Sequence, residues 1–235
     1  MSDLFNFFTD NAGLLFDKTL AHLGIAALAM VVALALALPL GVFLGHRHAG
    51  AFLAINISNV FRALPSLALI AISLALFGLS LLNVEVALVA LAVPPILTNA
   101  YTAVDSVDPD AVEAARGMGM TERQVLTQVE LPLSWPLIFA GIRTAAVYVV
   151  ATAPLAAIAG GGGLGDLILN QATYKLSGVI AATIVTVVLA FAVDLLFAWV
   201  QRLVTPRGLV LPKEFHTIVP PTESDVPADI MAVPR

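Results

Sequence analysis

Long apolar stretches alternate with short polar breaks along the chain, and these stretches have the length of membrane-spanning helices. The first covers residues 20–44 and ends at His46-Arg47-His48. A spanning helix needs about 20 residues to cross a hydrocarbon core roughly 30 Å thick. The same pattern predicts further spans near residues 86–101, 133–158 and 178–200.

Another span is expected within residues 51–82, where polar residues and a proline interrupt the apolar pattern. In one interpretation the span begins near Ala63, and Arg62 extends its side chain to the cytoplasmic boundary. In the other, a helix begins earlier and breaks between Arg62 and Ser66, so that the break lines the path of a solute. Pro65 predicts a break or kink in either case, because it lacks a backbone donor and disfavours the helical conformation of the preceding residue.

The composition indicates a membrane protein and does not point to a nucleic-acid, disulfide or metal site. The chain has 235 residues, of which 60% are hydrophobic and 11% charged, and its mean hydropathy is +0.97. Soluble domains carry about a quarter charged residues, so we expect an all-α integral membrane protein with about five transmembrane helices. A net charge of −5 offers no basic surface for nucleic acid. Without cysteine or a metal-spaced cluster, we predict no disulfide, no thiolate site and no metal.

Both ends of the chain differ from the apolar middle. Residues 1–19 mix charged side chains with phenylalanine and leucine, which is typical of an amphipathic or irregular segment at a membrane surface. No basic region or small-residue cleavage site precedes the first apolar stretch, so we expect no cleaved signal peptide. Residues 205–235 are rich in proline and predict a largely disordered tail. The transmembrane domain is therefore expected at residues 20–204.

Lysine and arginine predict the orientation, because cytoplasmic loops carry the excess of basic residues. If the polar loop at residues 105–132 is cytoplasmic, Lys18 and Lys175 lie outside. The cytoplasmic side then holds the other flanking basic residues: Arg47, Arg116, Arg123, Arg202, Arg207 and Lys213. We therefore expect a multi-pass protein with its N-terminus outside and its C-terminus inside.

The polar loop at residues 105–132 predicts two short helices. Asp108-Pro109-Asp110 is a strong helix start, because Asp108 can cap, Pro109 suits the first helical position and Asp110 is favourable against the helix dipole. This first helix should stop near Gly117 or Gly119.

The second short helix starts at Thr121-Glu122-Arg123-Gln124, which has the spacing of a capping box, and should end before Pro132. Val125, Leu126 and Val129 supply an apolar stripe that can pack beneath the first helix. Ala114 and Ala115 are expected to leave backbone exposed, so that the groove of another protein can close around it. A rigid helix in a groove transmits a displacement, although the residues alone also fit an ordinary connector.

Several polar features within the spans are candidates for a solute path. Pro94-Pro95 frees carbonyls that neighbouring helices or waters must satisfy, so the third span should lie inside a bundle. Asp194 lies near the end of the last span, where water or Arg202 could reach it, and a structural role is favoured. The candidates are polar, aromatic or glycine residues beside breaks: Arg62, Pro65, Ser66, Asn99, Tyr101, Tyr148, Gly162 and Gly163.

The glycine run at residues 160–165 matches the spelling of a dinucleotide-binding G-x-G-x-x-G but not its context. No strand pattern precedes it, and Val185 stands where the ribose-binding acid should be. The glycines instead fit a re-entrant or mouth-lining loop, or else a flexible external loop.

The polar loop resembles the EAA loop of permease subunits of bacterial ABC importers. The resemblance rests on Glu113-Ala114-Ala115, Gly119, Val129 and Leu131-Pro132, with Val129 where isoleucine is common in that family. It implies a MetI-like bundle of about five helices per subunit, a dimer around a central path and a cytoplasmic pair of coupling helices. The residues it assigns to coupling with an ATPase are Glu113, Ala114, Ala115, Arg116, Gly119, Leu131 and Pro132.

The resemblance also implies the partners and the location. A separate ATPase subunit would receive the coupling helix and bind ATP and Mg, an extracytoplasmic binding protein would deliver solute, and the complex would lie in the bacterial inner membrane. This chain has no G-x-x-x-x-G-K-[ST] and no catalytic constellation, since His46 and His48 would not share a helix face. We therefore predict a transport subunit rather than an enzyme, with no cofactor of its own.

Within that family the chain looks most like permeases for glycine betaine, carnitine and choline, over about residues 15–205. The matching pieces are residues 65–69, 99–104, 107–109 and 160–165. A permease for methionine or another amino acid is an alternative, because such permeases share the architecture. An ion-coupled secondary transporter is a further alternative, although we find one intramembrane acid, Asp194, and no convincing internal repeat.

Overall fold

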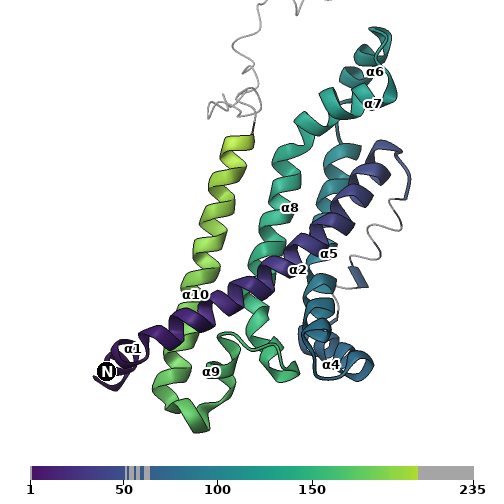
Figure 1. Cartoon of the computed structure of the whole chain (residues 1–235). Coiled ribbons are helices and arrows are strands. Elements are labelled where there is room, and N and C mark those ends of the chain that lie inside the picture. The colour runs from purple at the N-terminus through teal and green to yellow at the C-terminus, as the bar shows by residue number, and fades with distance from the viewer. Residues whose placement is uncertain (1, 51, 53–55, 57–58, 61–63, 206–235) are drawn as a thin grey trace, which may run out of the picture. The chain divides into compact units, whose positions relative to one another are not determined.

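The computed structural model describes residues 2–50, 52, 56, 59–60 and 64–205. Throughout these residues every regular element is a helix, which confirms the all-α prediction (Figure 1). Four described stretches are long and apolar enough to cross a membrane, and one shorter apolar helix accompanies them, in keeping with about five predicted spans. The four stretches are Ala12–His46, Leu81–Asp105, Glu122–Ala159 and Gln171–Val204.

The long helices are α2 (Ala12–His46), α5 (Leu81–Asp105), α8 (Leu131–Thr152) and α10 (Gln171–Val204). The shorter α-helices are α1 (Ser2–Asp10), α4 (Ser66–Phe77), α6 (Pro109–Gly117), α7 (Glu122–Val125) and α9 (Gly165–Leu169). A π-helical turn (Leu126–Glu130) and a 3-10 helix (Ala153–Ala159) continue α8 at its two ends.

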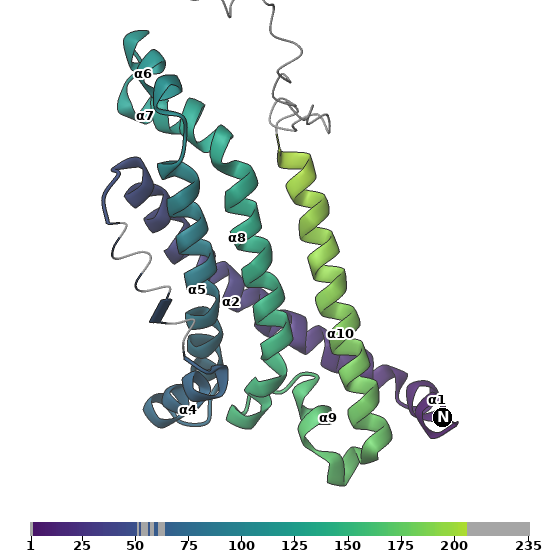
Figure 2. The same cartoon turned by 180° about the vertical axis from the view of Figure 1, so that it is seen from behind.

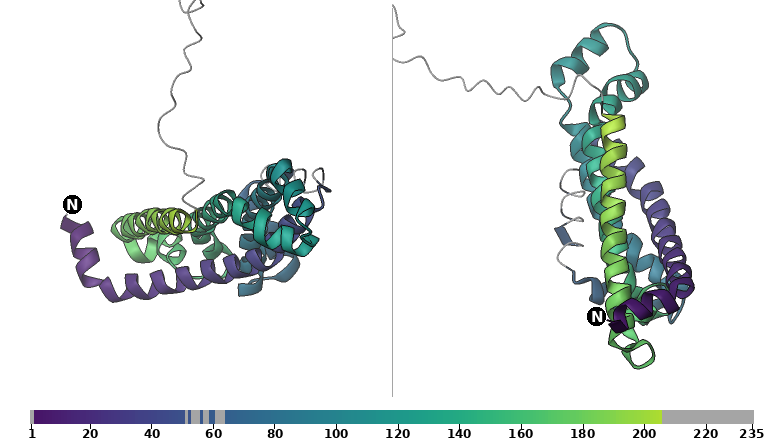
Figure 3. Two further views of the ribbon diagram at one scale, coloured as in Figure 1. Left: turned by 90° about the horizontal axis from the view of Figure 1, so that it is seen from above. Right: turned by 90° about the vertical axis from the view of Figure 1, so that its left-hand side faces the viewer.

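Helices α5, α8 and α10 run side by side with α8 in the middle, and α2 crosses them obliquely (Figures 1 and 2). Helices α6 and α7 project from one end of this bundle, which is also the end where α2 finishes and α10 reaches Val204. The elements α4 and α9 lie at the opposite end (Figure 3). The buried prolines Pro94 and Pro95 of α5 confirm that this span lies inside a bundle.

Small residues let α2 approach α5 closely. The buried face of α2 is largely alanine, and at Gly41 an added Cβ would lie 2.7 Å from the Cβ of Ala100 and 2.8 Å from the carbonyl oxygen of Leu97. Lipid gives helices no hydrophobic reason to associate, so close backbone approach at such small residues supplies the packing energy instead.

The first span begins earlier than residue 20. Helix α2 starts at Ala12 and includes Asp17 and Lys18 in its first turns. The charge of Lys18 is accommodated because its Nζ lies 2.6 Å from Oδ2 of Asp166, next to the glycine run. Part of the segment that was expected to lie on the membrane surface is therefore the beginning of the first long helix.

The placement of α4 argues against one of the two interpretations of the second span. Helix α4 packs against the 3-10 helix at the end of the bundle opposite α6, and its Ser73 donates a hydrogen bond to the carbonyl of Asn83. A span that began near Ala63 at the cytoplasmic end would put these residues at the other end, so that interpretation is wrong. Pro65 caps α4 directly, as a break before Ser66 requires, whereas Arg62 lies outside the described residues.

The contact between α2 and α5 predicts a selective effect of added bulk. Gly41→Leu should lower the free energy of unfolding in detergent by about 1–3 kcal/mol, because the side chain has no room between the helices. Gly24→Leu in the same helix is the matched control, since an added Cβ there meets nothing within 4 Å. Thermal unfolding of the purified variants measures both, and equal stability of the two would contradict the close packing.

Candidate coupling site and solute path

The first short helix starts and stops where the sequence predicts. The side chain of Asp108 accepts a hydrogen bond from the backbone N–H of Asp110 at 3.0 Å, and Pro109 is the first residue of α6. At the other end, Gly119 adopts a φ of +86°, and the N–H of Met120 donates to the carbonyl of Ala115. This is the hydrogen-bond pattern of a Schellman motif, which ends α6 and turns the chain toward α7.

The second short helix begins as predicted but does not end before Pro132. Thr121 and Gln124 form the predicted capping box. The helix then continues through the π-helical turn into α8, and the N–H of Leu131 bonds to the carbonyl of Leu126. Pro132 cannot donate to the backbone ladder, and the widened turn before it accommodates that loss without ending the helix. Leu131 and Pro132 therefore form the start of α8 rather than the end of a loop.

The two short helices share a small apolar core of their own. Val107, Val112, Ala115 and Val125 are buried in it, and Met120 and Val129 pack against them. The expectation that Ala115 is exposed is therefore wrong, because this side chain, 1% exposed, faces α7.

The outward surface of α6 carries Glu113, Ala114, Gly117 and Met118 instead. Met118 is 74% exposed, and sequence analysis passed over it. A large apolar side chain between two glycines in a polar loop was the available signal. This surface is called the outer face of α6 below.

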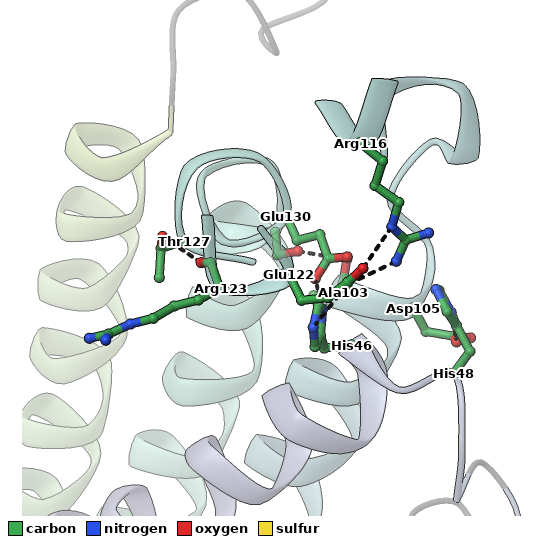
Figure 4. A network of polar contacts seen from close by, with 10 residues as sticks. His46, His48, Ala103, Asp105, Arg116, Glu122, Arg123, Thr127 and Glu130 are labelled. Carbon is green, nitrogen blue, oxygen red and sulfur yellow. Dashed lines mark hydrogen bonds and ion pairs between the residues drawn. The ribbon is translucent and has the colours of Figure 1, made fainter. Parts of the chain in front are cut away.

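A chain of polar contacts ties the helix pair to the end of α2 (Figure 4). Arg116 donates two hydrogen bonds to the carboxylate of Glu122, at 3.1 and 3.0 Å, and this bonding raises the pKa of Arg116 above its usual value. Glu122 lies 3.7 Å from Nε2 of His46, whose Nδ1 lies 2.6 Å from Oε2 of Glu130. Because Glu130 is only 1% exposed, its carboxylate depends on this partner.

This network was not predicted from the sequence. His46 and Glu130 are far apart in the sequence, and His46 had been considered only with its neighbour His48. In the structure His48 instead pairs with Asp105 at the surface, 2.9 Å away. The available signal was an acid immediately before Leu131-Pro132, at the point where the chain re-enters an apolar stretch.

Two of the described candidates for a solute path, Ser66 and Tyr148, line the same cavity. That cavity has a volume of about 380 Å³ and is lined by Leu64, Ser66, Leu91, Pro94, Pro95, Tyr148 and Thr152.

The other candidates are used in packing. Tyr101 is buried beside α2, and Asn99 donates to the carbonyl of Pro95 within α5. Gly162 and Gly163 lie in a turn that packs against α2, with Gly163 next to His22. The glycine run is therefore seated on the bundle.

Asp194 has a partner that the sequence did not suggest. Arg143 of α8 donates from Nε and Nη2 to the two carboxylate oxygens of Asp194, at 2.6 and 2.7 Å. Arg202 was the basic residue considered for this role, but the structure pairs Asp194 with Arg143. An arginine inside an apolar stretch was itself a signal. Elsewhere, no group of three or more potential metal-ligating side chains occurs among the residues that the structure describes.

A family model described as "Binding-protein-dependent transport system inner membrane component" matches residues 37–207, which is most of the chain. The chain belongs to this family. It is therefore a multi-pass integral membrane permease of the ABC transporter class, as the EAA loop predicted.

Named relatives match the permease over nearly their whole length. It is 40% identical to the glycine betaine/carnitine/choline transport system permease protein OpuCB of Bacillus subtilis (strain 168), over 91% of this chain and 99% of the relative. The choline transport system permease protein OpuBB of the same organism is 39% identical over the same shares. The osmoprotectant import permease protein OsmW of Salmonella typhimurium is 36% identical over 88% and 99%.

A solved structure confirms the fold of the permease. A chain of the MetNI methionine ABC transporter, in inward-facing conformations, matches with a TM-score of 0.72 at 22% identity, over 84% of this chain and 99% of that chain. The predicted MetI-like bundle is therefore correct.

The network at the helix pair predicts unequal effects for two neighbouring histidines of the permease. His46→Ala should destabilise the folded state by about 3 kcal/mol, because it leaves the buried carboxylate of Glu130 without its partner. His48→Ala should cost less than about 1 kcal/mol, since its pair with Asp105 is exposed. Thermal unfolding and limited proteolysis within residues 105–132 measure the difference, and similar losses would refute the role given to Glu130.

Proposed function

We propose that this permease is the transmembrane subunit of an ATP-driven importer for small osmoprotectants such as glycine betaine, choline or carnitine. The observation that carries the proposal is the agreement of the named relatives, which are 36–40% identical over most of both chains. The helix pair of α6 and α7 supports it, because it is a compact, capped unit fixed to the membrane helices.

Under this proposal the outer face of α6 docks into a groove of a separate ATPase subunit, which binds ATP and Mg. Glu113, Ala114 and Met118 make the contact, whereas Ala115 and Arg116 hold the helix in shape. Gly119 sets the turn to α7, and Leu131 and Pro132 carry the displacement into α8. A second permease subunit completes the path, and an extracytoplasmic binding protein delivers the solute.

The polar network is the route by which a displacement of α6 reaches the membrane helices. Arg116 links α6 to α7 through Glu122, and His46 links α2 to Glu130 at the start of α8. A push on α6 therefore acts on α2 and α8 together, as a rigid-body coupling requires.

The proposed orientation places the helix pair in the cytoplasm, with the N-terminus outside and the C-terminus inside. Lys18 lies beside Asp166 at the end opposite the helix pair, together with the start of α10. The described flanking arginines at the end of the helix pair are Arg47, Arg116, Arg123 and Arg202. This distribution fits the positive-inside rule. We also propose that the transmembrane domain runs from α2, which begins before residue 20, to residue 204, and that residues 205–235 are a cytoplasmic tail.

Neither alternative function gains support. The likeness to the methionine transporter is at the level of the fold, so it does not favour methionine or another amino acid as the solute. An ion-coupled transporter gains no support from the named relatives, since each of them is named as a transport system permease or an import permease.

Reconstitution into proteoliposomes tests the proposal directly. Uptake of glycine betaine or choline should require the permease, its ATPase, ATP and the loaded binding protein together. Uptake by the permease alone along an ion gradient would overturn the proposal, and so would ATP-driven uptake restricted to methionine.

The turn at Gly119 offers a finer test of coupling. Its φ of +86° disfavours branched side chains, although an added Cβ would meet nothing within 4 Å. Gly119→Val should therefore lower solute-stimulated ATP hydrolysis by roughly tenfold, because the strained turn no longer presents α6 correctly. Gly119→Asn should retain most of it, because asparagine tolerates this conformation. Equal activity of the two variants would show that the turn does not set coupling.

A further inference from the structure

The ion pair between Arg143 and Asp194 lies deep in the membrane domain. At about 1.5 Å per helical residue, Asp194 is roughly 15 Å from the end of α10 at Val204. Arg143 is roughly 18 Å from the start of α8 at Leu131 by the same measure. Both charges therefore lie several turns inside helices that are long and apolar enough to span a membrane.

The pair is not enclosed by the bundle. The side chains of Arg143 and Asp194 are 35% and 30% exposed, and they open onto a groove between α8 and α10. The groove has a volume of about 440 Å³ and is lined by Ala140, Arg143, Thr144, Val147, Tyr148, Asp194 and Gln201. Charged groups at this depth are costly against lipid and occur where they face protein or a water-filled cavity. The groove is therefore expected to face protein or water and not hydrocarbon.

The groove continues toward the outer end of the bundle. Tyr148 lines both this groove and the cavity beside Ser66 and Thr152. Ala140, Thr144, Tyr148 and Thr152 follow one another at four-residue intervals, so they form one stripe along α8. This stripe leads from the outer cavity past the ion pair toward Gln201, near the cytoplasmic end of α10.

The groups around the pair match a particular class of solute. Only Nε and Nη2 of Arg143 donate to Asp194, which leaves Nη1 for a carboxylate. A quaternary ammonium has no N–H to donate and is recognised by aromatic faces and by negative charge, and Tyr148 and Asp194 offer both at the same groove. A solute that carries both charges can lie across the pair, with each charge beside its opposite.

We propose that this groove is a solute site of the permease itself, which favours small zwitterions that combine a quaternary ammonium with a carboxylate. Arg143 binds the carboxylate, and Tyr148 with Asp194 binds the ammonium group. The inference rests on the proposed import of osmoprotectants and adds that the permease distinguishes glycine betaine from choline, which lacks the carboxylate.

Cysteine labelling tests whether the groove is wet and occupied, independently of transport. The chain has no cysteine of its own, so Thr144→Cys gives a single target in the assembled complex in proteoliposomes. A membrane-impermeant methanethiosulfonate reagent that carries a trimethylammonium group should modify it, and glycine betaine should slow the reaction roughly tenfold. Ala140→Cys is the second position, in case the first variant assembles poorly.

Leu196→Cys is the matched control. Leu196 is 54% exposed, two residues beyond Asp194 and therefore at nearly the same depth, but it lies about 200° around the helix. It should not react. Failure of both groove cysteines to react, or reaction that glycine betaine does not slow, would overturn the proposal.

Transport by Arg143→Gln tests the assignment of the carboxylate. With a saturated wild-type binding protein, uptake of glycine betaine should fall roughly 10- to 100-fold, because a charged hydrogen-bond partner is lost. Uptake of choline should fall much less. Equal losses for both solutes would mean that the pair only supports the fold. Tyr148→Leu should slow both solutes, whereas Tyr148→Phe should not, because it retains the aromatic face.

Failure of the proposed function and failure of the zwitterion site give different results. If the wild-type complex imports neither solute, the proposed function is wrong, whatever the labelling shows. If it imports both and Arg143→Gln leaves their ratio unchanged, only the zwitterion site is wrong.

Discussion

The buried carboxylate of Glu130 constrains the whole end of this permease that carries α6 and α7. A carboxylate that is almost fully removed from water must be paired or hydrogen-bonded, and here the partner is the imidazole of His46. That single contact joins the last turn of α2 to the point where the helix pair becomes α8. The helix pair consequently behaves as part of the membrane bundle and not as a tethered loop, and its outer face is presented in one orientation.

The contact between His46 and Glu130 depends for its effect on the close packing of α2 against α5. Helix α2 lies against α5 through alanines and glycines, so a force applied at His46 is passed on through backbone contacts that leave little room for adjustment. Bulky side chains at these positions would have separated the helices and let each move alone. Coupling and packing therefore depend on the same residues of α2.

Local signals in the sequence were enough for much of this structure. Asp108, Thr121 and Gly119 determine their caps and turn through neighbouring backbone groups, and the apolar stretches determine the helices through length alone. Contacts between distant residues could not be predicted. The sequence of the span that contains Asp194 does not indicate that Arg143 of another helix is its partner. The predictions for Ala115 and Pro132 were wrong for a related reason. The facing of a helix and the continuity of a proline-containing turn depend on packing against α7 and on the π-helical turn, which sequence spacing does not show.

The continuity of α7, the π-helical turn and α8 has a mechanical consequence. Tyr148 lies roughly 25 Å along α8 from Leu131, yet no loop separates it from the helix pair. An α-helix resists twisting along its length far more than a loop does, so α8 transmits a rotation from one end to the other. A rotation applied to α8 at the helix pair would therefore also turn the stripe of Ala140, Thr144, Tyr148 and Thr152, and it would act on the ion pair that joins Arg143 to Asp194 of α10.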